Sequence, residues 1–307
     1  MASLSTDVPR QTPVRAYLIL ATGVAAVTLA AIFIKLAQAQ GVPSLFIAAA
    51  RLAIAAVILT PITLRRHWRD IRGLKRRDLM LALLAGFFLA LHFATWIQSF
   101  EYTTVLVSVV LVTTSPLWIA IAEITLLRAK LGGLLIIGLV IGITGSMIVA
   151  IPPDGIIELG NAPLTGSLLA LTGGIMVAAY LLIGRSLRTH LPLLPYIWLV
   201  YSCAALILMI FVELSGISIV GYPAESYLWL LALALIPQLI GHTSFNYALR
   251  YFSATYTSIS IELEPVLSAI IAYFLFSEIP NTLQIIGSGI ILVGVTLASL
   301  AQARSSN

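Results

Sequence analysis

The chain has 307 residues, of which 60% are hydrophobic and only 9% are charged, with a mean hydropathy of +1.05. Soluble domains carry roughly 25% charged residues, so this composition excludes a water-soluble protein and predicts a polytopic membrane protein. The net charge of +5 is interpreted as basic residues in loops that set the orientation of membrane helices, and no nucleic-acid partner is expected. A lone cysteine, Cys203, excludes a disulfide framework and a thiolate metal site, so we expect neither a metal nor a cofactor.

The hydropathy pattern predicts an all-α membrane protein with ten transmembrane helices. About 20 apolar residues are needed to cross about 30 Å of hydrocarbon, and the first run is too long for the apolar core of a signal peptide. The connecting segments are too short for a soluble domain. The ten predicted spans are 17–36, 45–64, 79–98, 104–126, 132–151, 164–184, 195–214, 227–248, 255–277 and 283–301.

Basic residues predict the orientation of these helices. Of the 17 Lys and Arg residues, 15 lie in the tails and alternate loops on one side of the predicted membrane, and the loops on the other side have none. By the positive-inside rule, both termini are expected in the cytoplasm. The cation-rich stretch Arg65–Arg77 is interpreted as a solvated loop that sets topology, with contact to lipid or nucleic acid as the alternative. The remaining two cations, Lys35 and Arg51, lie within predicted helices.

The chain is an internal duplication. Four turn or kink residues recur after 149 positions without a gap: Tyr102, Pro116, Gly138 and Gly145 return as Tyr251, Pro265, Gly287 and Gly294. Each copy spans five predicted helices, an odd number, so the second copy enters the membrane from the opposite side. Such inverted repeats let a carrier alternate between two related conformations. The predicted organisation is a tail 1–16, a first repeat 17–151, an extracytoplasmic linker 152–163, a second repeat 164–301 and a tail 302–307.

The residues around the kinks resemble the drug/metabolite transporter superfamily, and in particular its EamA-type ten-helix exporters. The resemblance rests on Leu263-Glu264-Pro265, Phe276-Ser277-Glu278 and Thr113-Thr114-Ser115-Pro116, each copy being followed by the paired glycines. One departure is Ala129, which stands where the repeat register places the counterpart of Glu278. The resemblance implies a multi-pass carrier of the inner or plasma membrane that exports amino acids or other amphiphilic metabolites.

Two acidic residues in the ninth predicted helix are the first candidates for the substrate pathway. Glu264 is expected roughly 15 Å deep, near the midplane, where a charge is costly and therefore marks a functional position. Glu262, two residues away, faces a different direction. Pro265 frees a backbone carbonyl beside Glu264, so Pro265 and its counterpart Pro116 are hinge candidates. The alternative for Glu264 is a protonated carboxyl that only stabilises the kink.

Arg51 and Lys35 are the basic candidates. Arg51 is expected roughly 10 Å from the outer boundary and would bind a substrate carboxylate or an acidic side chain, or else extend to the interface. Lys35 lies at the outer end of the first predicted helix, where extension to water costs little.

Polar and aromatic side chains form short stripes on the third and eighth predicted helices. His92 and Trp96 are four residues apart and share a face, which Ser99 extends; Trp96 could instead belong to the interfacial aromatic belt. His242 and Asn246 repeat this spacing. Because the repeat is inverted, we expect the two stripes at opposite depths along an alternating-access pathway, although polar side chains that only join helices would look similar.

Weaker candidates complete the set. Trp118 would line the inner end of the fourth helix, whereas Glu123 beside it is expected to pair with Arg128 or Lys130. Tyr180 and Tyr256 would stack on a substrate, or else only pack helices. Gly138 with Gly142, and Gly287 with Gly289, predict small helix faces for packing within the chain, with a homodimer contact as the alternative.

Missing motifs narrow the function. The sequence has no Walker A loop, no GxSxG and no HExxH, which excludes an ATP-driven pump and common hydrolases. We therefore expect a secondary transporter that exports small amphiphilic metabolites, amino acids foremost, with Glu264 or His92 as the proton carrier if transport is proton-coupled. The alternatives are an importer, an exchanger or facilitator, and, outside transport, a membrane scaffold or channel.

Overall fold

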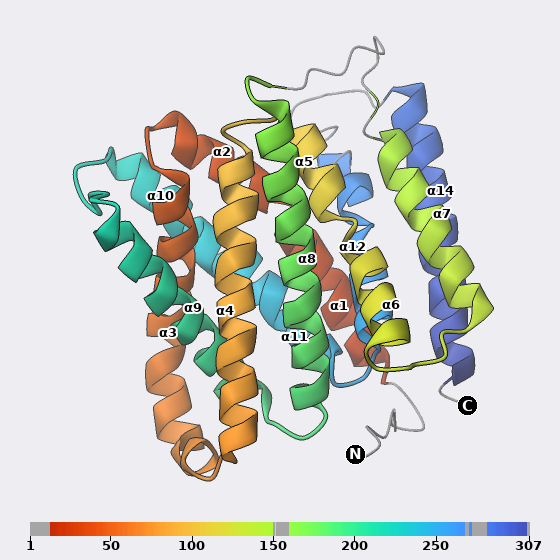
Figure 1. Cartoon of the computed structure of the whole chain (residues 1–307), viewed down its shortest axis with the longest axis horizontal. Helices are drawn as coiled ribbons and strands as arrows, with labels where there is room; N and C mark the ends of the chain where they lie inside the picture. Colours follow the sequence, from red (N-terminus) through yellow and green to blue (C-terminus); the bar gives the residue numbers. More distant parts are fainter. Residues whose placement is uncertain (1–12, 150, 152–159, 268–269, 272–280, 306–307) are drawn as a thin grey trace.

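The computed structural model describes residues 13–149, 151, 160–267, 270–271 and 281–305. The described chain folds into a bundle of helices (Figure 1). The first part contains α1 Val14–Val27, α2 Ala30–Ala39, α3 Ser44–Arg72, α4 Arg76–Ser99, α5 Val105–Val112, α6 Ser115–Thr125 and α7 Gly133–Val149. The second part contains α8 Pro163–Arg188, α9 Leu193–Leu214, α10 Ala224–Leu233, η1 Ala234–His242, α11 Thr243–Ala248, α12 Ala254–Ile261 and α14 Thr282–Ser305.

Eight helical stretches within the described residues are long and apolar enough to cross a membrane, and α7 is a shorter apolar helix of 17 residues. Large apolar side chains on their outer surface, such as Leu18, Val57 and Leu206, are mostly exposed. In water such a surface would cause aggregation, whereas lipid covers it at no cost. The chain is therefore a multi-pass membrane protein. The ninth predicted span, 255–277, lies partly outside the described residues.

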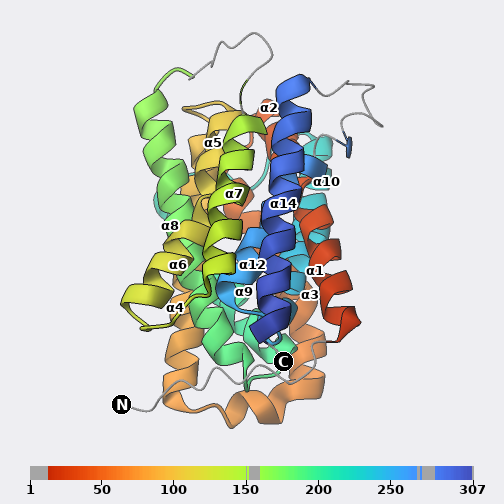
Figure 2. The same ribbon diagram turned by 90° about the vertical axis from the view of Figure 1, so that its right-hand side faces the viewer.

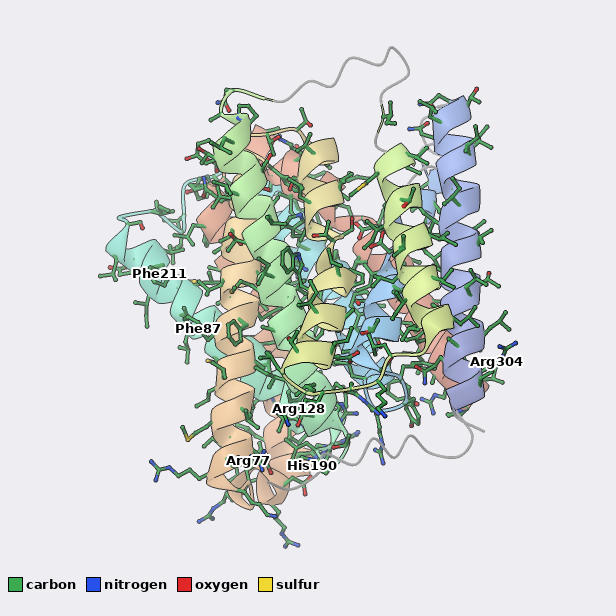
Figure 3. All side chains as sticks on the ribbon, turned by 45° about the vertical axis from the view of Figure 1, so that its right-hand side comes forward. Arg77, Phe87, Arg128, His190, Phe211 and Arg304 are labelled. Carbon is green, nitrogen blue, oxygen red and sulfur yellow. The ribbon has the colours of Figure 1, made fainter. Side chains whose placement is uncertain are left out.

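The basic end of the bundle can be followed in the figures. The helix α1 begins and α14 ends at the same end (Figures 1 and 2). Figure 3 places Arg77, Arg128 and Arg304 toward that end as well. This arrangement is what the charge distribution predicts, and the assignment of that end to the cytoplasm stays a prediction.

Two of the predicted helices are broken at equivalent points of the duplication. Between α5 and α6 the helix is interrupted at Thr113 and Thr114, and α12 is followed by an interruption at Glu262 and Leu263. These pairs are 149 positions apart, and a proline follows each of them, two residues after the break. A third interruption, at Thr28 and Leu29, separates α1 from α2. Interrupted membrane helices are tolerated where they face protein or a cavity, so the breaks indicate an internal site.

One of the contacts between the two repeats joins α7 to α14, which lie side by side in Figures 1 and 2 and pack along their length; α3 and α4 also pack on α8 and α9. Glycines permit the contact. An added Cβ on Gly138 would lie 2.7 Å from the Gly294 carbonyl oxygen, and one on Gly145 would lie 2.8 Å from that of Gly287. The predicted use of Gly138 within the chain is confirmed. Gly289 has no neighbour within 4 Å of an added Cβ, so the second small face is formed by Gly287 and Gly294 instead.

Candidate functional site

A cavity lies where both repeats contribute helices. It contains about 600 Å³ of space not filled by atoms, including its open mouth, which falls within the range of small-molecule sites. It is lined by Val27, Ala30, Arg51, His92, Trp96, Val112, Thr113, Ser115, Val177, Leu181, His242, Phe245, Ile261 and Glu264. All three of the helix breaks border this cavity. Five of the sequence candidates are therefore brought together: Arg51, His92, Trp96, His242 and Glu264.

Arg51 is the most unusual residue of the cavity wall. It lies in the middle of α3 with no exposed surface, and its guanidinium carbon is 4.0 Å from the centre of the Phe93 ring. None of its three guanidinium nitrogens has a hydrogen-bond partner among the residues that the structure describes. Full burial does not fit the predicted alternative in which Arg51 extends to the membrane interface. A buried cation without an anion is costly, and the geometry leaves its donors available to an anionic ligand.

His92 and Trp96 form one wall of the cavity. The His92 ring stacks on the Trp96 ring, with 5.7 Å between centres and 12° between planes, which confirms their shared face on α4. The Nδ1 of His92 donates a hydrogen bond of 2.9 Å to the Gly173 carbonyl oxygen on α8. This bond fixes the imidazole and leaves Nε2 as the other polar atom of the ring.

The predicted opposite depths of the two histidine stripes are wrong. The ring centres of His92 and His242 are 6.3 Å apart, and both rings line the same cavity. Part of the difference comes from η1, a π-helical segment around Pro237 that ends at His242. A π-helix advances less along its axis per residue than an α-helix does, so a depth counted at the α-helical rise overestimates how far along the helix His242 lies.

Glu264 and Glu262 face different cavities, as their two-residue spacing predicts. Glu264 begins the helical residues 264–267 and lines the main cavity. Glu262 is buried in a second, smaller cavity, where one carboxylate oxygen accepts a hydrogen bond from Ser146 on α7. The hinge candidates Pro116 and Pro265 lie just after the breaks at Thr113–Thr114 and at Glu262–Leu263. Each is the second residue of the helical segment that follows its break.

Three further candidates contact residues of the cavity wall without lining the cavity themselves. Ser99 donates to the Trp96 carbonyl oxygen and bonds Ser108. Asn246 is fully buried and donates to the hydroxyl of Tyr180 and to the His242 carbonyl oxygen. The cavity lining includes none of Ser99, Asn246 and Tyr180. The Tyr180 ring is nevertheless close, with its centre 6.4 Å from that of His242.

The remaining candidates lie elsewhere. Lys35 donates to the Phe100 carbonyl oxygen at 3.0 Å, Trp118 donates to Thr114 at 3.2 Å, and the Tyr256 hydroxyl bonds Ser299 at 3.0 Å. Glu123 also differs from expectation. It is buried and accepts a hydrogen bond from Thr255, rather than pairing with Arg128 or Lys130 at the surface.

Sequence reasoning missed Phe93 and Gly173. Phe93 is the ring beneath Arg51, and Gly173 supplies the carbonyl that orients His92. A Cβ on Gly173 would lie 3.1 Å from the Trp96 Cβ, so glycine allows α8 to approach α4. The adjacent glycines Gly173-Gly174 within an apolar helix were the available signal.

Comparisons with known proteins agree with this architecture. The family model described as "EamA-like transporter family" matches residues 14–151 and 164–300. One relative, an uncharacterized transporter of Archaeoglobus fulgidus, is 24% identical over 229 residues, covering 73% of this chain and 77% of that protein. Another uncharacterized transporter of the same organism is 32% identical over 73 residues, which span only 27% of its length. A crystal structure with 18% sequence identity superimposes with a TM-score of 0.76, covering 96% of this chain and all of that one, and shares the fold.

Proposed function

This chain belongs to the EamA-like transporter family, and we propose that it exports small amphiphilic metabolites, amino acids foremost, through the cavity between its repeats. The family and the transporter relatives support membrane transport. The choice of substrate class comes from the chemistry of the cavity wall.

A single observation carries the proposal: Arg51 is fully buried in the cavity wall, and its guanidinium nitrogens have no partner. An α-carboxylate is the planar anion that such a fork of donors fits best. No ion pair joins Arg51 to any acidic residue in the described part of the chain. The substrate itself would complete the pair.

Glu264 supplies the complementary charge. It lines the same cavity as Arg51 but forms no salt bridge with it. A zwitterion can therefore place its carboxylate on Arg51 and its ammonium group on Glu264. The rings of Trp96, His92 and Phe245 and the side chains of Val177 and Leu181 offer apolar contact to the rest of the molecule. Such a site favours an amino acid with an apolar or aromatic side chain.

Alternating access would use the breaks between α5 and α6 and after α12. Each break is followed by a proline and borders the cavity, and the two are equivalent by the repeat. A hinge in one repeat thus has a counterpart of opposite orientation in the other, as two opposite-facing states require.

The test is counterflow in proteoliposomes loaded with one unlabelled amino acid at a time, followed by uptake of the same labelled compound. We expect exchange of apolar or aromatic amino acids by the wild type. Glu264→Gln should weaken exchange of the amino acid while leaving exchange of its deaminated carboxylic acid intact. If the wild type exchanges carboxylic acids alone, the substrate is an organic anion held by Arg51. If it exchanges neither, the proposed substrate class is wrong.

Direction and coupling are tested in the same vesicles. An exporter with proton coupling accumulates the substrate against its gradient when a pH gradient is imposed, whereas a facilitator only equilibrates it. Right-side-out and inside-out vesicles distinguish export from import.

A further inference from the structure

The second cavity has the features of an ion site. It contains about 150 Å³ of space not filled by atoms, its opening included, has no room for a water-sized sphere, and lies between α5, α7 and the end of α12. Its polar lining residues are Thr113, Thr114, Ser146 and Glu262, and no Lys, Arg or His is among the described residues that line it. Gly142 on α7 lies beside this carboxylate side chain, since an added Cβ there would be 3.9 Å from the Glu262 Cγ, an ordinary packing distance.

Glu262 is incompletely satisfied. Its exposed fraction is 1%, and the Ser146 hydroxyl donates to Oε2, while Oε1 has no partner among the described residues. A buried carboxylate oxygen without a donor is unfavourable in hydrocarbon unless a cation binds to it. Glu262 thus carries an unpartnered oxygen and lines a cavity in which none of the described lining residues is positively charged.

The hydroxyl groups around Glu262 present oxygens rather than protons. Thr113 donates its hydroxyl proton to the Val110 carbonyl at 3.0 Å, and Thr114 donates to the Leu111 carbonyl at 2.7 Å. Ser146 directs its proton to Glu262. Thr114 also accepts a hydrogen bond from the Trp118 indole, which leaves one lone pair on its oxygen, and lone pairs also remain on Thr113 and Ser146, so all three residues that line the cavity can offer oxygen ligands.

We propose that Glu262, Ser146, Thr113 and Thr114 form a binding site for a small monovalent cation, Na⁺ or a proton, that is coupled to transport. One carboxylate neutralises one charge, whereas a divalent ion would leave a net charge within the hydrocarbon. An all-oxygen environment suits hard cations. As a coupling site this inference rests on the proposed function, but cation binding alone does not.

The position of the site explains how an ion would affect the substrate. Ser146 belongs to the first repeat and Glu262 to the second, so the ion would tie the repeats together. Thr113 lines both this cavity and the cavity that contains Arg51. Glu262 lies at the break after α12, and Glu264 follows it in the main cavity. Occupancy of the ion site therefore acts directly on the two breaks that frame the substrate cavity.

The experiment measures binding of radioactive Na⁺ to the purified full-length protein in alkaline buffer, with choline keeping the ionic strength constant. The variants are Glu262→Gln and Ser146→Ala. The matched control is Thr144→Ala, an exposed hydroxyl on the same helix that bonds only its own helix, at Val140. We expect saturable binding that is lost in Glu262→Gln, weakened in Ser146→Ala and unchanged in Thr144→Ala.

If the bound cation is a proton, it is detected by the infrared absorption band of a protonated carboxyl group. If wild type binds no Na⁺, a band that disappears as the pH rises, is absent from Glu262→Gln and persists in Glu264→Gln identifies the ion as a proton. The proposal is overturned if neither Na⁺ binding nor this band differs between wild type and the Glu262 and Ser146 variants.

Amino-acid binding to the same preparations separates this result from the substrate proposal. Cation binding without amino-acid binding would contradict the proposed substrate class. Amino-acid binding without cation binding would contradict the ion site. If Glu262→Gln does not fold, Ser146→Ala still tests the ion site, because this variant keeps the carboxylates of both Glu262 and Glu264.

Discussion

The Arg51 guanidinium lies 4.0 Å above the Phe93 ring and forms no salt bridge with any acidic residue in the described part of the chain. A cation–π contact stabilises a desolvated cation by about 2 kcal/mol, which is less than the several kcal/mol that burial of an ion costs. The protein therefore holds Arg51 at a net cost in folding free energy. Such a cost is expected where a charge serves ligand binding rather than stability.

The first prediction follows from this cost. Arg51→Met keeps a long side chain over Phe93 but removes the unpaired charge, so the melting temperature should rise, by an amount equivalent to about 1–4 kcal/mol. Amino-acid affinity should fall about 10- to 100-fold, the loss expected for a charged hydrogen bond of about 1.5–3 kcal/mol. Thermal unfolding and equilibrium binding measure the two effects.

Lys35→Met is the matched control, because Lys35 bonds the Phe100 carbonyl outside the cavity. It should leave the affinity unchanged. A large fall in the melting temperature of Arg51→Met would show that Arg51 has a structural partner and would contradict this account.

The second prediction concerns the two nitrogens of His92. Asparagine can donate to the Gly173 carbonyl in place of Nδ1, whereas leucine cannot. His92→Asn should keep the stability of the wild type, and His92→Leu should lose about 1 kcal/mol. Both should reduce counterflow because both lack Nε2. Wild-type transport by His92→Asn would restrict His92 to a structural role.

The third prediction tests the joint between the repeats. An added Cβ on Gly294 would lie 2.6 Å from the Gly142 nitrogen, so Gly294→Ala must push α14 away from α7. Overpacking of this kind costs about 1–3 kcal/mol. Gly289→Ala, on the same helix with open space around it, should have no effect on thermal unfolding. Equal stability of the two variants would mean that the helices can separate freely.

The fourth prediction tests orientation. With Cys203→Ser as background, single cysteines are placed at two exposed positions, Arg77 in the first turn of α4 and Ser218 in the loop after α9. The start of α4 and the loop after α9 lie at opposite ends of the bundle in Figure 1. A membrane-impermeant maleimide should label Ser218→Cys in intact cells and should label Arg77→Cys only after lysis. The reverse pattern would place the basic end outside.

Much of the fold could be predicted from hydropathy and duplication. The apolar runs located the spans, and the recurrence of Gly138, Gly145, Gly287 and Gly294 revealed the duplication, but the sequence did not predict that these glycines bring α7 against α14. Helix ends were less accurate. The helix α3 continues to Arg72, eight residues beyond the predicted end of its span, because a helix can extend into water after its apolar segment ends.

The cavity was only partly predictable. The spacing of His92 and Trp96 predicts a shared face, and the spacing of Glu262 and Glu264 predicts different faces, and the structure confirms both. The spacing within a helix does not say which face meets a neighbouring helix. Tyr256 therefore contacts Ser299 on α14, outside the cavity, although its sequence context resembles that of the other aromatic candidates. The break at Thr28 has no proline or glycine beside it, so it gave no signal.

The glycine contacts between α7 and α14 also bear on how the duplication arose. Shifting Gly138 and Gly145 by 149 positions gives Gly287 and Gly294, so the contact of Gly138 with Gly294 becomes that of Gly287 with Gly145. A contact set that maps onto itself is the mark of an isologous interface between two identical subunits. A single five-helix ancestor carrying this glycine pair could have joined its own copy, inserted upside down, before the two genes were fused. Each substitution in that ancestor would have changed both halves of the joint at once.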